Sequence, residues 1–263
     1  MADVEVTRDG KVATVTLNRP HARNAVTRDM WATIRDELAA LAQDDTVGCV
    51  VLTGAGDAFC AGGDVKDMGE RLMKPSETTL DEEVGYIREI VQASALLHTM
   101  PKVTIARING AAAGAGLSLA FACDMRIMAS DAKLTTAFAN IALSGDFGGA
   151  WFLSRIVGGA KARELFFLAP RLTGDEAMAM GVVNQAVPRE RLDAHVTEVA
   201  EKIANGPTGT FAAMKANFAD TALPLDEYLA AEAQRMAEAF HTNDHREAAM
   251  AFIQKREPAF TGT

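Results

Sequence analysis

Strands and helices alternate along the first part of this chain, and this order restricts its fold more than any other sequence feature. Short, mostly apolar segments at Gly48–Thr53, Val103–Ile108 and Asp124–Ala129 predict β-strands. Apolar residues at helical spacing, including Val84 and Ile87, predict a helix between the first two. Because parallel strands need a crossover that is usually a helix, the pattern predicts an α/β fold with βαβ units and a largely parallel sheet.

The N-terminal segment predicts a hairpin followed by a helix. Val4–Arg8 and Lys11–Leu17 have strand-like composition and flank Asp9-Gly10, a dipeptide typical of tight hairpin turns. Further along, apolar residues at helical spacing from Met30 onward predict a helix with Thr27 as its N-cap.

The chain changes character near residue 190 and becomes mainly helical. Periodicity predicts four helices, at residues 190–205, 208–219, 225–240 and 244–255. We therefore expect two parts, a core over residues 1–190 and a helical region over residues 191–263.

Length and charge limit the classes of partner. A chain of 263 residues allows one or two domains. Lys and Arg number 26 against 35 Asp and Glu, which gives a net charge of −9, and without a basic stripe no nucleic acid is expected as a partner. The longest uncharged run, Ile108–Cys123, has 16 residues, fewer than the ~20 that span a membrane. With no signal-peptide pattern at the N-terminus, the sequence predicts a cytoplasmic protein that makes no contact with membranes.

The segment from Gly114 to Ala120 approaches two known motifs without matching either. A dinucleotide-binding fingerprint needs a third glycine where this chain has Leu119. The segment also nearly matches the nucleophile elbow of serine hydrolases, with Ser118 at the nucleophile position. Six residues separate Ile108 from Ala115, whereas the elbow joins strand and turn directly, so a hydrolase is disfavoured.

Histidines and cysteines give no convincing metal site. His241 and His245 are four residues apart, but Thr242-Asn243-Asp244 between them is typical of a helix start. The three cysteines form no CxxC motif and are interpreted as small core residues; they are Cys49, Cys60 and Cys123.

Two loops of small residues, Ala58–Asp64 and Asn109–Gly116, each follow a predicted strand. Small side chains allow a ligand carbonyl to approach backbone N–H groups, and two such donors would form an oxyanion hole. Close packing of a helix against a sheet selects the same residue types. The spacing alone leaves both interpretations open.

At these loops the sequence resembles the enoyl-CoA hydratase/isomerase family, also called the crotonase superfamily. The order and spacing of the matching segments make the resemblance specific, and it covers nearly the whole chain. The matching segments are Leu17–Ala25, Ala58–Asp64, Ile108–Gly116, Ala122–Arg126, Gly148-Gly149, Ala177–Val183 and Phe252–Phe260.

The resemblance implies a crotonase-like spiral of ββα repeats, followed by a C-terminal helical region that mediates trimerisation. Two trimers often stack as a hexamer, so a homotrimer or hexamer is expected. The family binds acyl-coenzyme A thioesters as substrates and needs no metal or redox cofactor. Its shared intermediate is a thioester enolate.

The resemblance also implies positions for the site. The oxyanion hole maps onto the N–H groups of Ala61 and Ala115. Coenzyme A would be bound by one set of residues from this chain and by two from a neighbouring subunit. The first set is Arg23, Ala25, Asp64, Val65 and Lys66, and the second is Phe252 and Lys255.

Departures from the family pattern concern the catalytic carboxylates. Hydratases of the family have two glutamates, and this chain has Ser118 and Phe138 at those positions. Hydration by the usual mechanism needs both carboxylates and is therefore disfavoured. Asp146 stands in an uncharged stretch at a position where some family members, among them the isomerase of aerobic phenylacetate breakdown, place an aspartate that faces the acyl group. An apolar wall from Phe138 and Phe147 would raise its pKa. A structural interpretation is that Asp146 caps a helix that begins near Phe147.

The preferred interpretation is an enoyl-CoA isomerase in which Asp146 moves a proton and the oxyanion hole holds the enolate. Three alternatives stay open. Asp146 and water would add to or cleave the same type of substrate, as in a hydratase or lyase. Asp146 would act as a nucleophile in an aryl-CoA dehalogenase, although His98 does not align with the additional histidine of that group. The chain would bind acyl-CoA without catalysis. Residues 64–82 and 138–147 are expected to shape the acyl pocket, but the sequence does not identify the acyl group.

Overall fold

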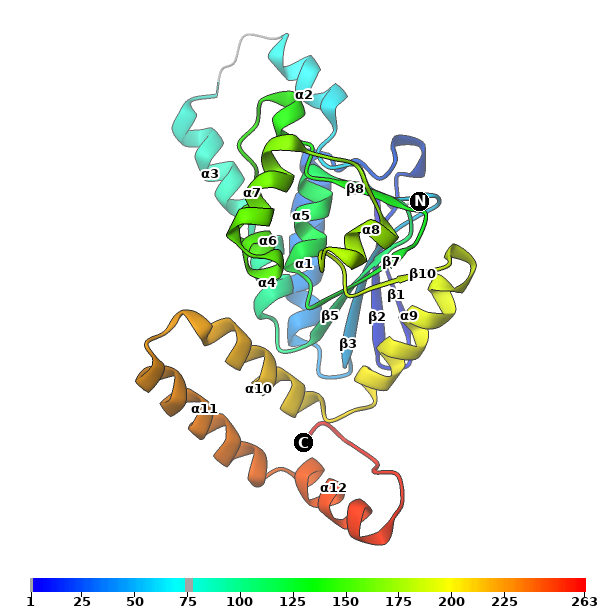
Figure 1. The fold of residues 1–263 in the computed structure, drawn as a ribbon, viewed down its shortest axis with the longest axis vertical. Helices are drawn as coiled ribbons and strands as arrows, with labels where there is room; N and C mark the ends of the chain where they lie inside the picture. Colours follow the sequence, from blue (N-terminus) through cyan, green and yellow to red (C-terminus); the bar gives the residue numbers. More distant parts are fainter. Residues whose placement is uncertain (1, 74–77) are drawn as a thin grey trace.

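Two sheets form the centre of the molecule (Figure 1). The structure, a computed structural model, describes residues 2–73 and 78–263, without the side chains of residues 66 and 70–72. Residues 74–77 of the predicted surface segment 64–82 therefore lie outside the described residues. The larger sheet has the order β1 (Val4–Asp9), β2 (Val12–Leu17), β3 (Cys49–Gly54), β5 (Val103–Ile108), β7 (Met125–Ala129) and β10 (Gln185–Val187). The smaller sheet has the order β4 (Ala58–Cys60), β6 (Ala111–Ala113), β8 (Lys133–Thr135) and β9 (Leu172–Thr173).

Each repeat contributes one strand to each sheet. β3 and β4, β5 and β6, and β7 and β8 are consecutive pairs whose first strand joins the larger sheet and whose second strand joins the smaller one. Pairing within both sheets is parallel except for β1 with β2 and β8 with β9. The predicted α/β class and the spiral of ββα repeats are confirmed.

Helices follow the strand pairs and surround the sheets (Figure 1). The α-helices are α1 (Arg28–Gln43), α2 (Val65–Leu72), α3 (Leu80–Ile90), α4 (Gln92–Thr99), α5 (Gly114–Ala122), α6 (Gly149–Val157), α7 (Gly159–Leu168), α8 (Gly174–Ala179), α9 (Arg189–Ala204), α10 (Thr208–Ala219), α11 (Leu225–Phe240) and α12 (Asn243–Gln254). Short 3₁₀ helices are η1 (Pro20–Ala22), η2 (Phe138–Ile141) and η3 (Asp220–Ala222).

The N-terminal elements agree with the sequence prediction. β1 and β2 form the antiparallel hairpin, and Gly10 in its turn has φ +54°, which favours glycine. Thr27 caps α1, since its side chain accepts a hydrogen bond from the Met30 N–H. The apolar side of α1, including Ile34 and Leu38, is buried in the core.

The boundary between core and helical region falls later than predicted. α9 was assigned to the region 191–263, but its Leu192 and Val196 are buried in the same core as the sheets. α10, α11 and α12 instead extend away from the sheets (Figure 1). The division between core and helical region therefore comes after Ala204, because the apolar face of α9 covers the larger sheet.

One buried ion pair joins α10 to the core. The Lys215 ammonium lies 2.8 Å from Asp124 Oδ2 and donates to the carbonyl oxygens of Leu97 and Lys102 at 2.8 and 2.9 Å. Lys215 is only 8% exposed, so this attachment is shielded from solvent.

Cysteines and histidines occupy structural positions. Cys49, Cys60 and Cys123 are free thiols buried in the core, and burial raises the pKa of each to about 12. Thr242 caps α12 by accepting the His245 N–H at 3.0 Å, so a helix start separates His241 from His245 as predicted. Across the described residues, no helix combines the length and apolar character needed to cross a membrane.

Candidate active site

The two small-residue loops predicted from the sequence meet in the smaller sheet. β4 and β6 pair in parallel, with Ala58 opposite Ala111 and Cys60 opposite Ala112. α2 and α5 begin just after these strands, so two helix N-termini point out of the same edge of the sheet. A Cβ on Gly116 would lie 2.5 Å from the Cys60 sulfur. Close packing therefore does select the small residues of the second loop, and the same packing brings backbone N–H groups from both loops together.

The N–H donor of the first loop differs from the predicted one. The Ala61 N–H donates to the Arg23 carbonyl at 3.0 Å, so it is engaged within the protein. The parallel bridge between Val26 and Gly63 uses the carbonyl of Gly62 and the N–H of Asp64. Among the described residues nothing accepts the Gly63 N–H. Ala61 is therefore corrected to Gly63 as the candidate donor, two residues further along the same motif.

The predicted donor of the second loop, Ala115, lies at the start of α5. Ala115 is the second residue of α5, where N–H groups have no partner within the helix, and no described side chain caps this end. A Cβ on Gly62 would lie 3.5 Å from the Ala115 nitrogen and 3.1 Å from the Ala113 carbonyl oxygen. The missing side chain of Gly62, which has φ +95°, therefore allows the two loops to approach.

Two buried asparagines fix these loops, and neither was singled out from the sequence. Asn24 is fully buried and donates to the carbonyls of Ala55 and Ala58 at 2.9 and 2.8 Å. Asn109 donates to the carbonyls of Gly54 and Gly56 at 2.9 and 2.7 Å. Their side-chain amides satisfy carbonyl groups that a strand leaves unpaired when it turns. The signal was present, since both asparagines lie inside the matching motifs.

Residues predicted to bind coenzyme A surround the first loop. Arg23 is exposed, whereas Ala25 is buried beneath it. The Asp64 carboxylate accepts a hydrogen bond from Arg19 at 3.0 Å and ties the loop to the segment before α1. Val65, at the start of α2, is 60% exposed. The side chain of the predicted residue Lys66 lies outside the described residues.

Ser118 has no features of a nucleophile. It lies within α5, is 1% exposed, and its hydroxyl donates to the Gly114 carbonyl at 3.3 Å. A Cβ on Gly149 would lie 2.4 Å from the Ser118 oxygen, so this serine packs against the start of α6. Ser118 is the fifth residue of α5 and does not lie at a strand-to-helix turn, so the serine-hydrolase interpretation is wrong.

Asp146 is a half-buried carboxyl group that forms no ion pair with any described residue. Its Oδ1 atom is shielded from solvent, and no described group donates a hydrogen bond to it. Burial alone raises the pKa of Asp146 to about 6. The capping interpretation is wrong, since α6 begins at Gly149 and its N-cap, Gly148, has no side-chain cap. A carboxyl group held in this way changes its protonation state near neutral pH.

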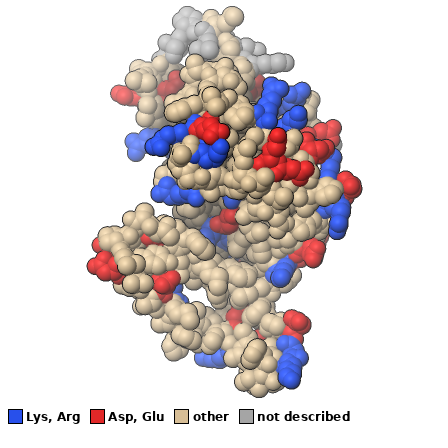
Figure 2. Space-filling view, viewed as in Figure 1, with Lys and Arg blue, Asp and Glu red and all other residues tan. Residues whose placement is uncertain are grey.

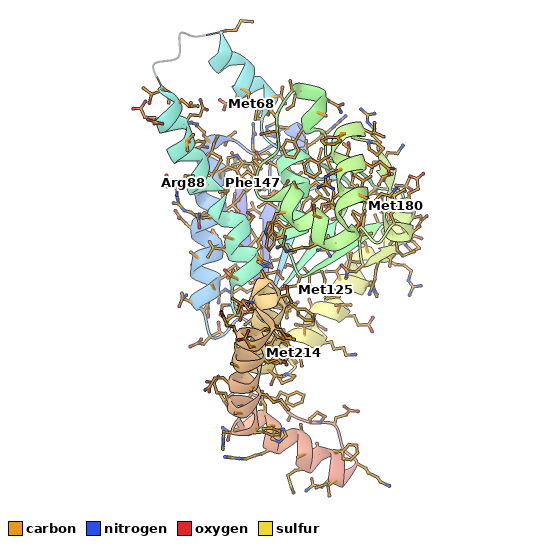
Figure 3. The ribbon with its side chains drawn as sticks, turned by 60° about the vertical axis from the view of Figure 1, so that its left-hand side comes forward. Met68, Arg88, Met125, Phe147, Met180 and Met214 are labelled. Atoms are coloured by element: carbon orange, nitrogen blue, oxygen red, sulfur yellow. The ribbon has the colours of Figure 1, made fainter. Side chains whose placement is uncertain are left out.

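The two predicted wall residues differ in what they contact. Phe147 (Figure 3) is 1% exposed. Its ring centre lies 4.3 Å from that of Trp31 in α1. Phe138 lies 3.9 Å from the positions that a Cβ would take on both Gly114 and Gly145. Because these glycines precede Ala115 and Asp146 directly, the Phe138 ring connects the candidate oxyanion donor with the carboxyl group.

His98 is not a partner of Asp146. Its ring makes edge contacts with Trp151 and Phe152 at 5.3 and 5.2 Å. Burial lowers the pKa of His98, and the charges that act on it are those of Lys215, Asp124 and Arg155. This location agrees with the sequence, where His98 did not align with the dehalogenase histidine.

Phe252 and Lys255 lie far from the other predicted residues in one chain. Both are exposed at the end of α12, in the helical region at the opposite end of the molecule from α2 (Figure 1). A single chain does not bring them to the site.

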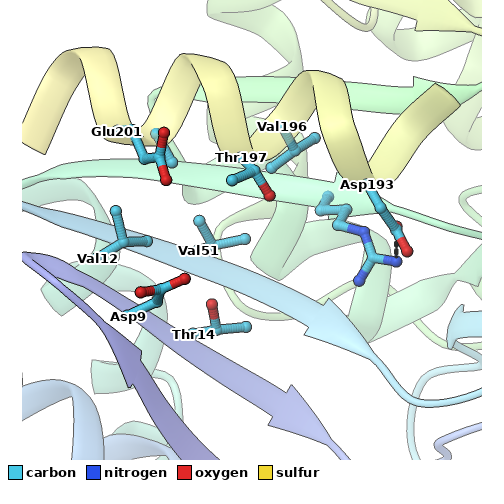
Figure 4. Close-up of a pocket in the computed structure, with 10 residues that line it drawn as sticks. Asp9, Val12, Thr14, Val51, Asp193, Val196, Thr197 and Glu201 are labelled. Carbon is cyan, nitrogen blue, oxygen red and sulfur yellow. Dashed lines mark hydrogen bonds and ion pairs between the residues drawn. The ribbon is translucent and has the colours of Figure 1, made fainter.

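A separate cavity of about 280 Å³ lies between the larger sheet and α9 (Figure 4). Asp9 and Thr14 line it from the hairpin, and Glu201 lines it from α9. Arg107 at its rim pairs with Asp193. It contains none of the predicted site residues, so we do not assign the chemistry to it.

The chain is similar over nearly its whole length to proteins with related names. A family model described as enoyl-CoA hydratase/isomerase matches residues 7–263. A probable enoyl-CoA hydratase from Rhodobacter capsulatus is 39% identical over 254 residues, which cover 95% of each chain. A 1,2-epoxyphenylacetyl-CoA isomerase from Escherichia coli is 37% identical over 253 residues, again 95% of each chain.

Solved structures share this fold. The crystal structure of a putative enoyl-CoA hydratase from Streptomyces coelicolor superposes with a TM-score of 0.94 at 32% identity and covers 100% of this chain and 95% of that one. The names of the relatives include both hydratases and an isomerase, so similarity alone does not separate these two reactions.

Proposed function

Since this chain belongs to the enoyl-CoA hydratase/isomerase family, we propose that it moves the double bond of an enoyl-CoA thioester with Asp146 as the acid/base. The observation that carries the proposal is the half-buried Asp146 carboxyl group, whose shielded Oδ1 atom has no hydrogen-bond partner among the described residues and whose pKa is raised by burial to about 6. Ser118 and Phe138 offer no second carboxylate. A 1,3-proton shift needs one proton carrier, whereas hydration by the family's usual mechanism needs two carboxylates.

The reaction has two proton transfers. In a 3-enoyl-CoA substrate, ionised Asp146 removes a proton from C2, and the electrons of that C–H bond move toward the thioester oxygen to give a dienolate. The N–H groups of Gly63 and Ala115 stabilise the oxygen charge. Protonated Asp146 then returns the proton to C4, the double bond forms between C2 and C3, and the carboxylate is regenerated.

The substrate supplies coenzyme A, and the proposal includes no metal or redox cofactor, because no electrons leave the substrate. Arg23 and Lys66 would bind coenzyme A phosphates and provide the local positive charge that a chain of net charge −9 lacks. Phe252 and Lys255 would reach this ligand from a neighbouring subunit of a homotrimer or a hexamer.

Substitution of Asp146→Asn tests the proposal. The variant keeps the shape of the side chain and removes the proton carrier, so turnover of 3-enoyl-CoA should fall by about 1,000-fold while acyl-CoA affinity changes less than about threefold. Asp175→Asn, at an exposed position in α8, is the matched control and should keep full turnover. Unchanged turnover in Asp146→Asn would exclude the mechanism.

Hydration is the second candidate, because several relatives are named as hydratases. In that reaction Asp146 would activate water toward a 2-enoyl-CoA. Mass spectrometry separates the two reactions, since hydration adds one water and isomerisation leaves the mass unchanged. In D₂O, isomerisation should exchange hydrogen at C2 and C4 for deuterium. Acyl-CoA binding without either change would indicate a non-catalytic protein.

A further inference from the structure

A second side chain near the proposed site has shielded polar atoms without a hydrogen bond. Arg28 is the first residue of α1, and its Nε and Nη2 atoms are shielded from solvent. None of the described residues accepts a hydrogen bond from either atom. The guanidinium carbon lies 3.6 Å from the centre of the Tyr86 ring of α3, so the group is held in place by a cation–π contact.

The location connects Arg28 to the wall beside Asp146. Arg28 and Trp31 are three residues apart on α1 and therefore share one side of that helix. The Trp31 ring packs at 4.3 Å against Phe147, the residue that follows Asp146. The order along this wall is therefore Arg28, Trp31, Phe147 and Asp146, so two aromatic rings lie between the guanidinium and the carboxyl group, as expected for a group near the far end of an acyl chain.

On the basis of the proposed function, we propose that Arg28 binds a carboxylate at the distal end of the acyl group, so that the substrate is an ω-carboxyacyl-CoA. The geometry of the two unpartnered N–H groups of Arg28, on Nε and Nη2, favours this class of substrate. Nε–H and Nη2–H point in parallel from one side of a guanidinium, and two parallel donors match the two oxygens of a carboxylate. Shielded N–H groups without hydrogen bonds are unfavourable, and a carboxylate bound to Nε and Nη2 would remove that cost.

A substrate carboxylate can reach the Nε and Nη2 side of the guanidinium only if α3 moves, because Tyr86 of α3 covers one face of this group. Ile90 is the one buried residue of this helix. A helix with so little buried surface shifts at a small cost in free energy, so it can admit an acyl chain between α1 and α3.

Binding of two thioesters of equal chain length tests the proposal, one ending in a carboxylate and one in a methyl group. Affinities are measured by calorimetry in the Asp146→Asn background, so that turnover does not alter the ligand. Arg28→Gln should weaken binding of the carboxylate-ended thioester by about 10- to 100-fold and change the methyl-ended one less than about threefold. Arg88→Gln, an exposed arginine of α3 (Figure 3), is the matched control and should change neither.

Arg28→Lys keeps the positive charge but not the two parallel N–H donors. Its affinity for the carboxylate-ended thioester should lie between those of the unsubstituted chain and Arg28→Gln. Thermal unfolding of each variant verifies that the fold is kept. Equal weakening of both thioesters in both variants, or a preference of the unsubstituted site for the methyl-ended one, would overturn the proposal. Because the readout is binding, a failure of isomerisation to occur at all would leave this test intact and would count against the proposed function alone.

Discussion

A carboxyl group that titrates near pH 6 has consequences for both activity and stability. The pKa of Asp146 is raised by burial from 3.8 to about 6. Since the ionised form removes the first proton, kcat/KM for a 3-enoyl-CoA should rise with pH and level off above about pH 7. A flat profile between pH 5 and 8 would contradict Asp146 as the base.

The same pKa predicts that Asp146 destabilises the folded protein at neutral pH. Between pH 4 and 6 the folded chain binds more protons than the unfolded chain, so the free energy of unfolding falls as pH rises through this range. A pKa of about 6 in place of 3.8 corresponds to about 3 kcal/mol. We expect Asp146→Asn to raise the free energy of unfolding by about 1–3 kcal/mol at pH 8 and to have no effect below about pH 4. Urea unfolding at several pH values measures this difference, and a gain that does not depend on pH would contradict the explanation.

At the scale of single residues, the sequence predicts the position of the proposed catalytic carboxylate but not its surroundings. Asp146 was identified because a charged residue in a long uncharged stretch is visible in the sequence. Its lack of a partner depends on side chains that fold around it and has no sequence signal. Ala61 was predicted instead of Gly63 because the motif does not show which N–H groups of the loop are already bonded within the protein. The Ala61 N–H donates to the Arg23 carbonyl, whereas the Gly63 N–H has no acceptor among the described residues.

At the scale of elements, the helices after residue 190 were predicted to within a residue or two, since their apolar periodicity is clear. The strands of the smaller sheet were missed. β4 and β6 have three residues each and are made of alanine, cysteine and phenylalanine, so neither length nor β-propensity separates them from loops. Tertiary pairing with neighbouring strands decides their conformation, and a short sequence window does not contain it.

Substitution of Gly62 tests whether the close approach of the loops that follow β4 and β6 matters for the reaction. Ala at this position would be strained at φ +95° and would place a Cβ 3.1 Å from the Ala113 carbonyl, which displaces one candidate N–H donor from the other. We expect Gly62→Ala to lower kcat by about 100-fold. The matched control is Gly10→Ala, which has φ +54° and open space around the added Cβ. Both substitutions should cost about 1–2 kcal/mol of stability, and only Gly62→Ala should lose activity.

Steady-state kinetics and urea unfolding of the two variants separate an effect on the geometry of the site from an effect on the stability of the fold. If both variants lost activity in proportion to their stability, the approach of β4 and β6 would have no specific role in the reaction.

At the scale of the whole molecule, the helical region exposes an apolar surface. In the view of Figure 2, uncharged atoms cover most of α10 and α11, whereas charged side chains gather over the core. Phe218 is 78% exposed, Leu225 70% and Phe240 53%. Such a surface in a protein without a membrane-spanning helix among its described residues is typical of a protein–protein interface. This observation supports the proposed homotrimer.

Charge at Phe218 should therefore dissociate the assembly. In the proposed trimer, Phe218→Asp would bury a carboxylate in an apolar interface, so sedimentation velocity should show monomers for this variant, whereas we expect trimers or hexamers for the unsubstituted chain. Met180 is an exposed apolar residue outside the helical region. Met180→Glu is therefore the control and should leave the assembly unchanged. Because Phe252 and Lys255 would come from a neighbouring subunit, dissociation should also weaken acyl-CoA binding, although neither residue is altered. A monomeric Phe218→Asp variant that binds acyl-CoA as tightly as the trimer would show instead that each chain completes its own site.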